Sequence, residues 1–205
     1  MRFATVVLAT LISLAAARTQ ANVIWNETSG DLSGDRLAPS AFVLNVGSNN
    51  LIGSVAGGEL DYVALTVPAG AQLTEITLVS YASVDQVAFI GMQQGATFTE
   101  PAVGTNVANL LGYTHFGSGG AAPGTDILDN IGTGAGAQGF VPPLPAAEYT
   151  FWIQQLGSLT EYNLDFVVVP EPSSWLLAVL SAVGALTYLR KHRRLAPRLR
   201  AERAP

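Results

Sequence analysis

The regular alternation of apolar and polar side chains is the property of this sequence that most limits its possible folds. It is clearest in residues 147–169, AEYTFWIQQLGSLTEYNLDFVVV, where apolar residues occupy every second position on both sides of LGSLT. A period of two is typical of a strand with one buried face, and a polar segment between two such runs indicates a turn. We therefore predict a β-hairpin with Tyr149, Phe151, Ile153, Leu164 and Phe166 in the core.

Shorter runs of the same kind precede this segment: AFVLNVG, LIGSVA, LDYVALTVPAG, AQLTEITLVSYAS and QVAFIGM. Leu65 falls on the apolar side of its strand and is predicted to be buried, and Pro68 and Gly70 are expected to end that strand. Residues 22–168 contain no helical stripe of apolar side chains. The pattern predicts an all-β domain at residues 22–168, folded as an antiparallel β-sandwich.

Residues 93–146 interrupt the alternation, and glycine is dense between Gly112 and Gly139. We predict a long glycine-rich loop insertion with a short helix or turn at residues 107–111. A loop of this length in a compact domain is commonly functional or disordered. It is therefore either the place of a binding surface or a surface insertion without a ligand.

The first 21 residues have the order of a secretory signal peptide. Arg2 precedes an apolar run from Phe3 to Ala17, and small residues follow. The positive end stays cytoplasmic while the apolar run inserts as a helix. Thr19 and Ala21 predict cleavage before Asn22, and a cut before Arg18 is the second possibility.

Charge is distributed very unevenly along the chain. Residues 22–172 contain fourteen Asp and Glu but only one base, Arg36, which gives this part a formal charge of −13. Such a surface repels phosphate backbones and excludes nucleic acid as a partner, whereas cations remain possible partners. The chain has no cysteine, so it forms no disulfide and offers no thiol nucleophile.

Catalytic residues are hard to find in the predicted exported part. His115 is its only histidine, and although Ser118 and Asp126 follow, nothing marks Ser118 as an activated nucleophile. We interpret His115 as a loop residue and predict a non-enzymatic protein. The alternative is a secreted hydrolase in which two of the many carboxylates converge.

Calcium is the metal that the composition favours, because carboxylates on flexible turns supply the hard oxygen ligands it requires. ETSGDLSGD contains Glu27, Asp31 and Asp35, and DILDN contains Asp126 and Asp129. Neither spacing is that of an EF-hand loop. These five residues are the candidate calcium ligands, and solvated acidic loops are the alternative interpretation.

The C-terminal segment, residues 169–205, has three consecutive parts. Pro170-Glu171-Pro172 is followed by an uncharged, mostly apolar run from Ser174 to Leu189 and then by the basic cluster Arg190, Lys191, Arg193 and Arg194. A helix over 174–189 would be roughly 24 Å long, shorter than the roughly 30 Å hydrocarbon core. The basic residues predict a cytoplasmic tail at 190–205 beyond a short transmembrane helix, as in an ordinary tail anchor.

The combination of Pro170-Glu171-Pro172, a short apolar helix and an arginine-rich end resembles the PEP-CTERM sorting signal of exported bacterial proteins. The resemblance implies recognition by an exosortase-type membrane enzyme that removes the helix, so that membrane attachment is transient. It also implies a host that makes an extracellular polysaccharide matrix, and hence polysaccharide as a partner.

A second, weaker resemblance concerns the domain itself. GELDYVALTVPAGAQL, residues 58–73, and PAAEYTFWIQQLGSLTEYNLDF are similar to segments of the pre-peptidase C-terminal (PPC-like) domain. That family implies a small β-sandwich, and some of its members bind calcium, polysaccharide or collagen.

These observations together predict an exported, surface-sorted, non-enzymatic protein of the cell envelope or extracellular matrix. A permanently anchored structural protein is the remaining alternative.

Overall fold

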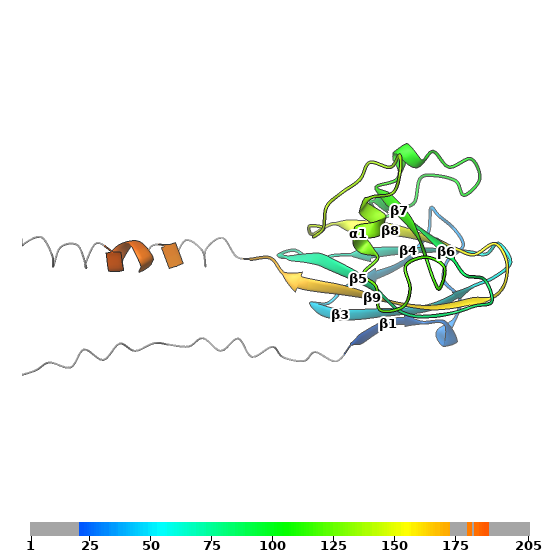
Figure 1. The fold of residues 1–205 in the computed structure, drawn as a ribbon, viewed down its shortest axis with the longest axis horizontal. Helices are drawn as coiled ribbons and strands as arrows, with labels where there is room; N and C mark the ends of the chain where they lie inside the picture. Colours follow the sequence, from blue (N-terminus) through cyan, green and yellow to red (C-terminus); the bar gives the residue numbers. More distant parts are fainter. Residues whose placement is uncertain (1–20, 173–179, 182, 189–205) are drawn as a thin grey trace, which may run out of the picture.

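The computed structural model describes residues 21–172, 180–181 and 183–188, and in these residues two β-sheets pack face to face (Figure 1). A four-stranded sheet has the order β1-β3-β9-β5, and a five-stranded sheet has the order β2-β4-β8-β6-β7. The strands are β1 (Asn22–Asn26), β2 (Ser40–Val43), β3 (Gly47–Val55), β4 (Leu60–Thr66), β5 (Ala71–Ala82), β6 (Ala88–Gln94), β7 (Gly112–Phe116), β8 (Glu148–Gln154) and β9 (Thr160–Pro170). The short helices are η1 (Glu27–Ser29), η2 (Val107–Asn109) and α1 (Leu128–Gly132).

The prediction of a sandwich is confirmed, but the prediction that it is wholly antiparallel is wrong. β1 pairs with β3 in parallel and β2 pairs with β4 in parallel, whereas the other pairs are antiparallel. Parallel neighbours require a crossover between them. The chain provides it by passing from β1 to β2 in the opposite sheet before it returns to β3.

The predicted hairpin of residues 147–169 is also wrong, although both of its strands exist. β8 pairs with β4 and β6, while β9 pairs with β3 and β5 in the other sheet. The segment between them therefore crosses from one sheet to the other. The two apolar faces meet across the core, where the rings of Phe151 and Phe166 have centroids 5.4 Å apart.

All six side chains predicted for the core are buried, with at most 2% of the surface of each exposed. β8 is buried on its second face as well, which period-two reasoning did not indicate. On that outer face Tyr62, Phe98, Leu110 and Trp152 form a separate apolar cluster. The loop after β6 covers part of it, and Arg36 anchors this loop by donating from Nη1 to the carbonyls of Phe98 and Thr99.

Residues 93–146 are mainly loop, as predicted, but they also contain β7 and α1, which were not predicted. The expected helical turn near residue 107 is η2. The glycines allow backbones to approach closely: a Cβ on Gly112 would lie 2.1 Å from the carbonyl oxygen of Ile131 in α1. The glycine density that obscured the strand is thus a condition for packing α1 against it.

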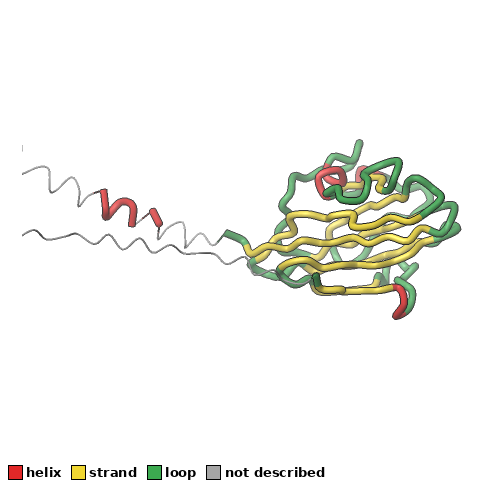
Figure 2. Tube along the Cα trace, turned by 60° about the horizontal axis from the view of Figure 1, so that its bottom comes forward, coloured by secondary structure: helices red, strands yellow, loops and turns green. Residues whose placement is uncertain are grey.

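Both ends of the domain lie at one end of the sandwich, here called the proximal end (Figures 1 and 2). Asn22 pairs with Asn49 at the start of β1, and Asn49 pairs with Phe166 near the end of β9. Beyond the end of β9, the Glu171 N–H donates a hydrogen bond to the Gly70 carbonyl at 2.8 Å. Gly70 has φ +76, so this turn requires glycine, as the predicted strand end suggested.

Several predicted features fall on or near residues outside the described part. Residues 1–20 of the predicted signal peptide and the basic cluster at 190–194 lie outside it. Within the predicted helix of 174–189, residues 180–181 and 183–188 are helical and exposed. Among the described residues, no helix has the length and hydropathy that crossing a membrane would demand.

Candidate functional site

The distal end of the sandwich, opposite Asn22 and Pro170, contains a buried polar pair. There, β4 and β9 bring Asp61 and Tyr162 together across the core, and the Tyr162 hydroxyl donates to Asp61 Oδ2 at 2.5 Å. Asp61 is completely buried, and its second oxygen, Oδ1, has no hydrogen-bond partner among the described residues. The sequence did not single out this pair, because Asp61 lies on the inward face of an otherwise apolar strand.

The environment of Asp61 strongly disfavours its charged form. Burial raises the pKa of Asp61 from 3.8 to about 7, although the hydrogen bond from Tyr162 acts in the opposite direction. Nearby Glu27, Asp31 and Glu59 raise this pKa further. Burial, followed by the neighbouring Asp61, raises the pKa of the Tyr162 hydroxyl well above its ordinary value. The distal end therefore contains a carboxyl group that titrates near neutral pH.

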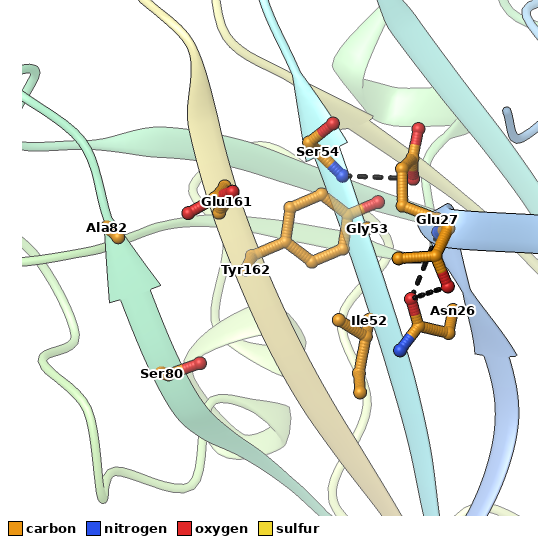
Figure 3. A pocket seen from close by; sticks show the side chains of 10 residues that line it. Asn26, Glu27, Ile52, Gly53, Ser54, Ser80, Ala82, Glu161 and Tyr162 are labelled. Atoms are coloured by element: carbon orange, nitrogen blue, oxygen red, sulfur yellow. Dashed lines mark hydrogen bonds between the residues drawn. The ribbon is translucent and has the colours of Figure 1, made fainter.

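A cavity of about 500 Å³, here called the acidic cavity, opens beside Tyr162 (Figure 3). The ring of Tyr162 points from β9 toward Gly53 of β3, and Glu27 lies beyond it at the start of η1. A Cβ at position 53 would lie 2.4 Å from the Tyr162 hydroxyl oxygen, so glycine is required for this ring position. The residues that line the cavity are Asn26, Glu27, Thr28, Ile52, Gly53, Ser54, Ser80, Ala82, Glu161 and Tyr162.

Glu27 is the carboxylate that the structure holds most firmly at this cavity. It accepts a hydrogen bond from the Ser54 N–H at 3.1 Å. Burial raises the pKa of Glu27, the Ser54 N–H lowers it, and a direct interaction with Asp31 raises it.

The candidate calcium ligands are only partly brought together. Glu27 and Asp31 interact, whereas Asp35 Oδ1 accepts from the Leu37 N–H in a local turn. Asp126 Oδ1 accepts from the backbone N–H groups of Ile76 and Leu128, and this links the start of α1 to β5. Asp129 is exposed in the first turn of α1. In the described part of the chain, no three His, Asp or Glu side chains form a group that could hold a metal ion.

Calcium binding by Glu27 and Asp31 stays a prediction that melting measurements can test. Calcium is expected to raise the melting temperature more than sodium at matched ionic strength, because a bound divalent cation relieves the repulsion between these carboxylates. By mass action, stabilisation would reach about 2.7 kcal/mol at a hundredfold excess over Kd. Asp31→Asn should abolish the calcium-specific part. Asp35→Asn is the matched control, and equal shifts in both salts would rule this site out.

His115, Ser118 and Asp126 are not assembled as a triad. The Ser118 hydroxyl donates to the Gln86 carbonyl, and the Asp126 carboxylate is engaged by backbone groups. His115 is exposed on β7 and its ring contacts Phe89 edge-on, with centroids 5.7 Å apart. This imidazole instead belongs to a surface that sequence reasoning missed.

That surface is a second cavity of about 300 Å³ on the outer face of the five-stranded sheet, here called the aromatic pocket. Its lining residues are Val87, Phe89, His115, Trp152, Gln154, Gln155 and Leu156. They come from β6, β7 and β8, from the residue before β6 and from the segment after β8. The only sequence signal was the set of aromatic residues on the supposedly polar faces, and no local pattern shows that these segments are neighbours.

Comparison with known proteins identifies no family for this chain. No family model matches the sequence, and no curated protein matches it. One solved structure with similarity is PliG from Aeromonas hydrophila, described as a periplasmic lysozyme inhibitor of g-type lysozyme. It shares 14% identity and a TM-score of 0.29, and the match covers 63% of this chain and 96% of that one.

Proposed function

We propose that this protein is an exported, non-enzymatic β-sandwich that is sorted to the cell envelope or extracellular matrix through its C-terminal Pro-Glu-Pro signal. In this proposal an exosortase-type enzyme recognises Pro170, Glu171 and Pro172 and removes the segment that follows. The basic cluster Arg190, Lys191, Arg193 and Arg194 holds that segment in the membrane until processing. The extracellular polysaccharide is the partner of the released domain.

The observation that carries this proposal is the position of the domain boundaries. β1 begins at Asn22, the residue after the predicted signal-peptide cut, and β9 ends at Pro170, the first residue of the sorting motif. The strand thus continues two residues into the predicted sorting segment. Pro170 has no backbone N–H to donate, which is tolerated at the end of a strand. Glu171 and Pro172 are exposed. Cleavage at both predicted sites would leave the core intact.

The arrangement of the two ends of the sandwich also supports this proposal. Both boundaries are proximal, whereas the acidic cavity and the aromatic pocket include distal residues such as Ser54 and Gln154. A domain attached through its proximal end would present these cavities away from the membrane. This is the geometry expected of a protein that binds material outside the cell.

Intact-mass analysis of the protein from its native host tests the sorting proposal. We expect a mature chain that begins at Asn22 and ends near Pro172. Neutral replacement of Arg190, Lys191, Arg193 and Arg194 is expected to make a chain that retains the C-terminal segment accumulate, because the positive-inside signal is lost. Replacing Arg198, Arg200 and Arg203 farther along the tail is the control.

The same mass spectrum would also reveal a chain that has not been processed. A mature protein that retains Trp175 to Arg194 would contradict processing and would favour the permanently anchored structural protein. Retention of residues 1–21 would contradict export through a cleaved signal peptide. These results depend on no ligand, so they test sorting separately from binding.

A further inference from the structure

The aromatic pocket is built by cross-strand neighbours on adjacent strands. Phe89 of β6 pairs with His115 of β7 on one side and with Gln154 of β8 on the other. These three side chains form one row across the outer face of the sheet. In the next row, Gly91 lies between Tyr113 and Trp152. Register alone therefore places an aromatic ring between an imidazole and a carboxamide.

Gly91 explains how the ring of Phe89 is held. A Cβ at Gly91 would lie 3.0 Å from Phe89 Cε1, so the ring extends over the space that the missing side chain leaves. Its centroid is 4.6 Å from that of Trp152 and 6.0 Å from that of Tyr113. Trp152 is only 5% exposed, whereas Phe89 is half-buried. The ring of Phe89 is thus held in place by its neighbours, and part of its surface remains accessible from the pocket.

The polar groups of the pocket divide into held and available ones. Gln155 is held in place, because its amide donates to the Val87 carbonyl and its Oε1 accepts from the Leu156 and Gly157 N–H groups. The side chains of His115 and Gln154 have no hydrogen bond to any described residue. An imidazole and a carboxamide can each donate and accept, so both can satisfy hydroxyl groups.

We propose that the aromatic pocket binds a neutral sugar ring of a polysaccharide, with the C–H face of the ring against Phe89 and its hydroxyls hydrogen-bonded to His115 and Gln154. A pyranose has an apolar face and a hydroxyl-bearing rim, and this combination matches an aromatic floor between two polar side chains that carry hydrogen-bonding nitrogen and oxygen atoms. A volume of about 300 Å³ is at the lower end of ligand pockets, so it suits a single ring rather than a long segment.

Charge decides which class of sugar is bound. The described residues that line the pocket include no Lys or Arg to pair with an anionic sugar. The formal charge of −13 on residues 22–172 also repels a polyanionic chain. Uronic-acid, sulfated and phosphorylated polymers are therefore disfavoured. This inference rests on the proposed function and deepens it by naming the class of polysaccharide.

Calorimetric titration of the purified full chain with glucose, mannose and galactose hexasaccharides tests this assignment, and hexagalacturonate is the charged counterpart. At least one neutral hexasaccharide is expected to bind, and the charged one at least about tenfold more weakly. The double variant with His115→Ala and Gln154→Ala should lose about tenfold or more in affinity, because sugar hydroxyls lose their partners. Phe89→Leu keeps an apolar side chain but removes the ring, and should weaken binding as well.

Gln72→Ala, on β5 of the other sheet, is the matched control and should bind as the unmodified chain does. Melting temperatures of all variants identify any change that comes from misfolding. Absence of binding to every neutral hexasaccharide would overturn the assignment, as would affinities that the His115, Gln154 and Phe89 variants leave unchanged. Because calorimetry does not depend on processing, this failure is distinct from a failure of sorting in the mass analysis.

Discussion

Replacement of Phe166 by alanine is expected to lower the free energy of unfolding by about 3–5 kcal/mol, the usual cost of removing a fully buried aromatic side chain. Phe166 is 0% exposed at the centre of β9 and meets Phe151 across the two sheets. Its loss would leave a cavity between layers that have no disulfide to hold them, since the chain contains no cysteine. Urea denaturation of the purified protein measures this change.

Val167→Ala is the matched control for this experiment. Val167 is the next residue on the same strand, but it lies on the outward face and is only half-buried. Its truncation should cost about 1 kcal/mol or less. Equal costs at the two positions would contradict the assignment of the inward face of β9.

The stability of the protein should decrease as the pH rises from about 4 to about 7, because of Asp61. Burial raises the pKa of this carboxyl from 3.8 to about 7 in the folded state. Between these two values the folded chain therefore retains a proton that the unfolded chain releases. Under such linkage the free energy of unfolding falls by about 4 kcal/mol across the window and changes no further above it.

Asp61→Asn should remove this pH dependence. Asparagine keeps an oxygen that can accept the hydrogen bond from Tyr162, but it avoids the cost of a buried charge. The variant is expected to match the unmodified protein near pH 4 and to be more stable by about 4 kcal/mol near pH 8. Denaturation curves across this range provide the measurement.

Glu161→Gln provides the control for the pH experiment, because Glu161 precedes Tyr162 but is exposed. Its stability should follow that of the unmodified protein across the whole range. Parallel curves for the unmodified protein and Asp61→Asn would mean that Asp61 does not titrate in this window. A loss of stability in Asp61→Asn at every pH would instead make the ionised carboxylate a favourable partner of Tyr162.

The errors in the predicted fold have one physical origin. Alternation shows which face of β8 and which face of β9 is apolar, and these two apolar faces are buried as predicted. It carries no information on which strand lies beside another, so two consecutive strands were interpreted as a hairpin although they belong to opposite sheets. In the same way, the edge position of β1 and β2 in parallel pairs depends on a crossover that no short segment encodes.

The same distinction applies to the candidate sites: the sequence indicated the site whose residues are close together in the chain and missed those built from distant segments. The acidic segment at Glu27 and Asp31 was found from the sequence, because its carboxylates are close together in the chain. Asp61 was not found, since its unusual pKa arises from burial opposite Tyr162, a residue 101 positions away. The aromatic pocket was missed for the same reason, because the ring of Phe89 meets His115 and Gln154 only through the pairing of three strands.

The sequence by itself determined the β class of the domain, the inward side chains of its main strands and its strongly negative charge. These properties follow from local periodicity and composition, which are present before any long-range contact forms. Only the tertiary structure decided the strand order, the two parallel edges, the near-neutral titration of Asp61 and the neighbours of Phe89. Each of these depends on distant segments brought together by core packing, and packing is a property of the whole chain rather than of any short stretch within it.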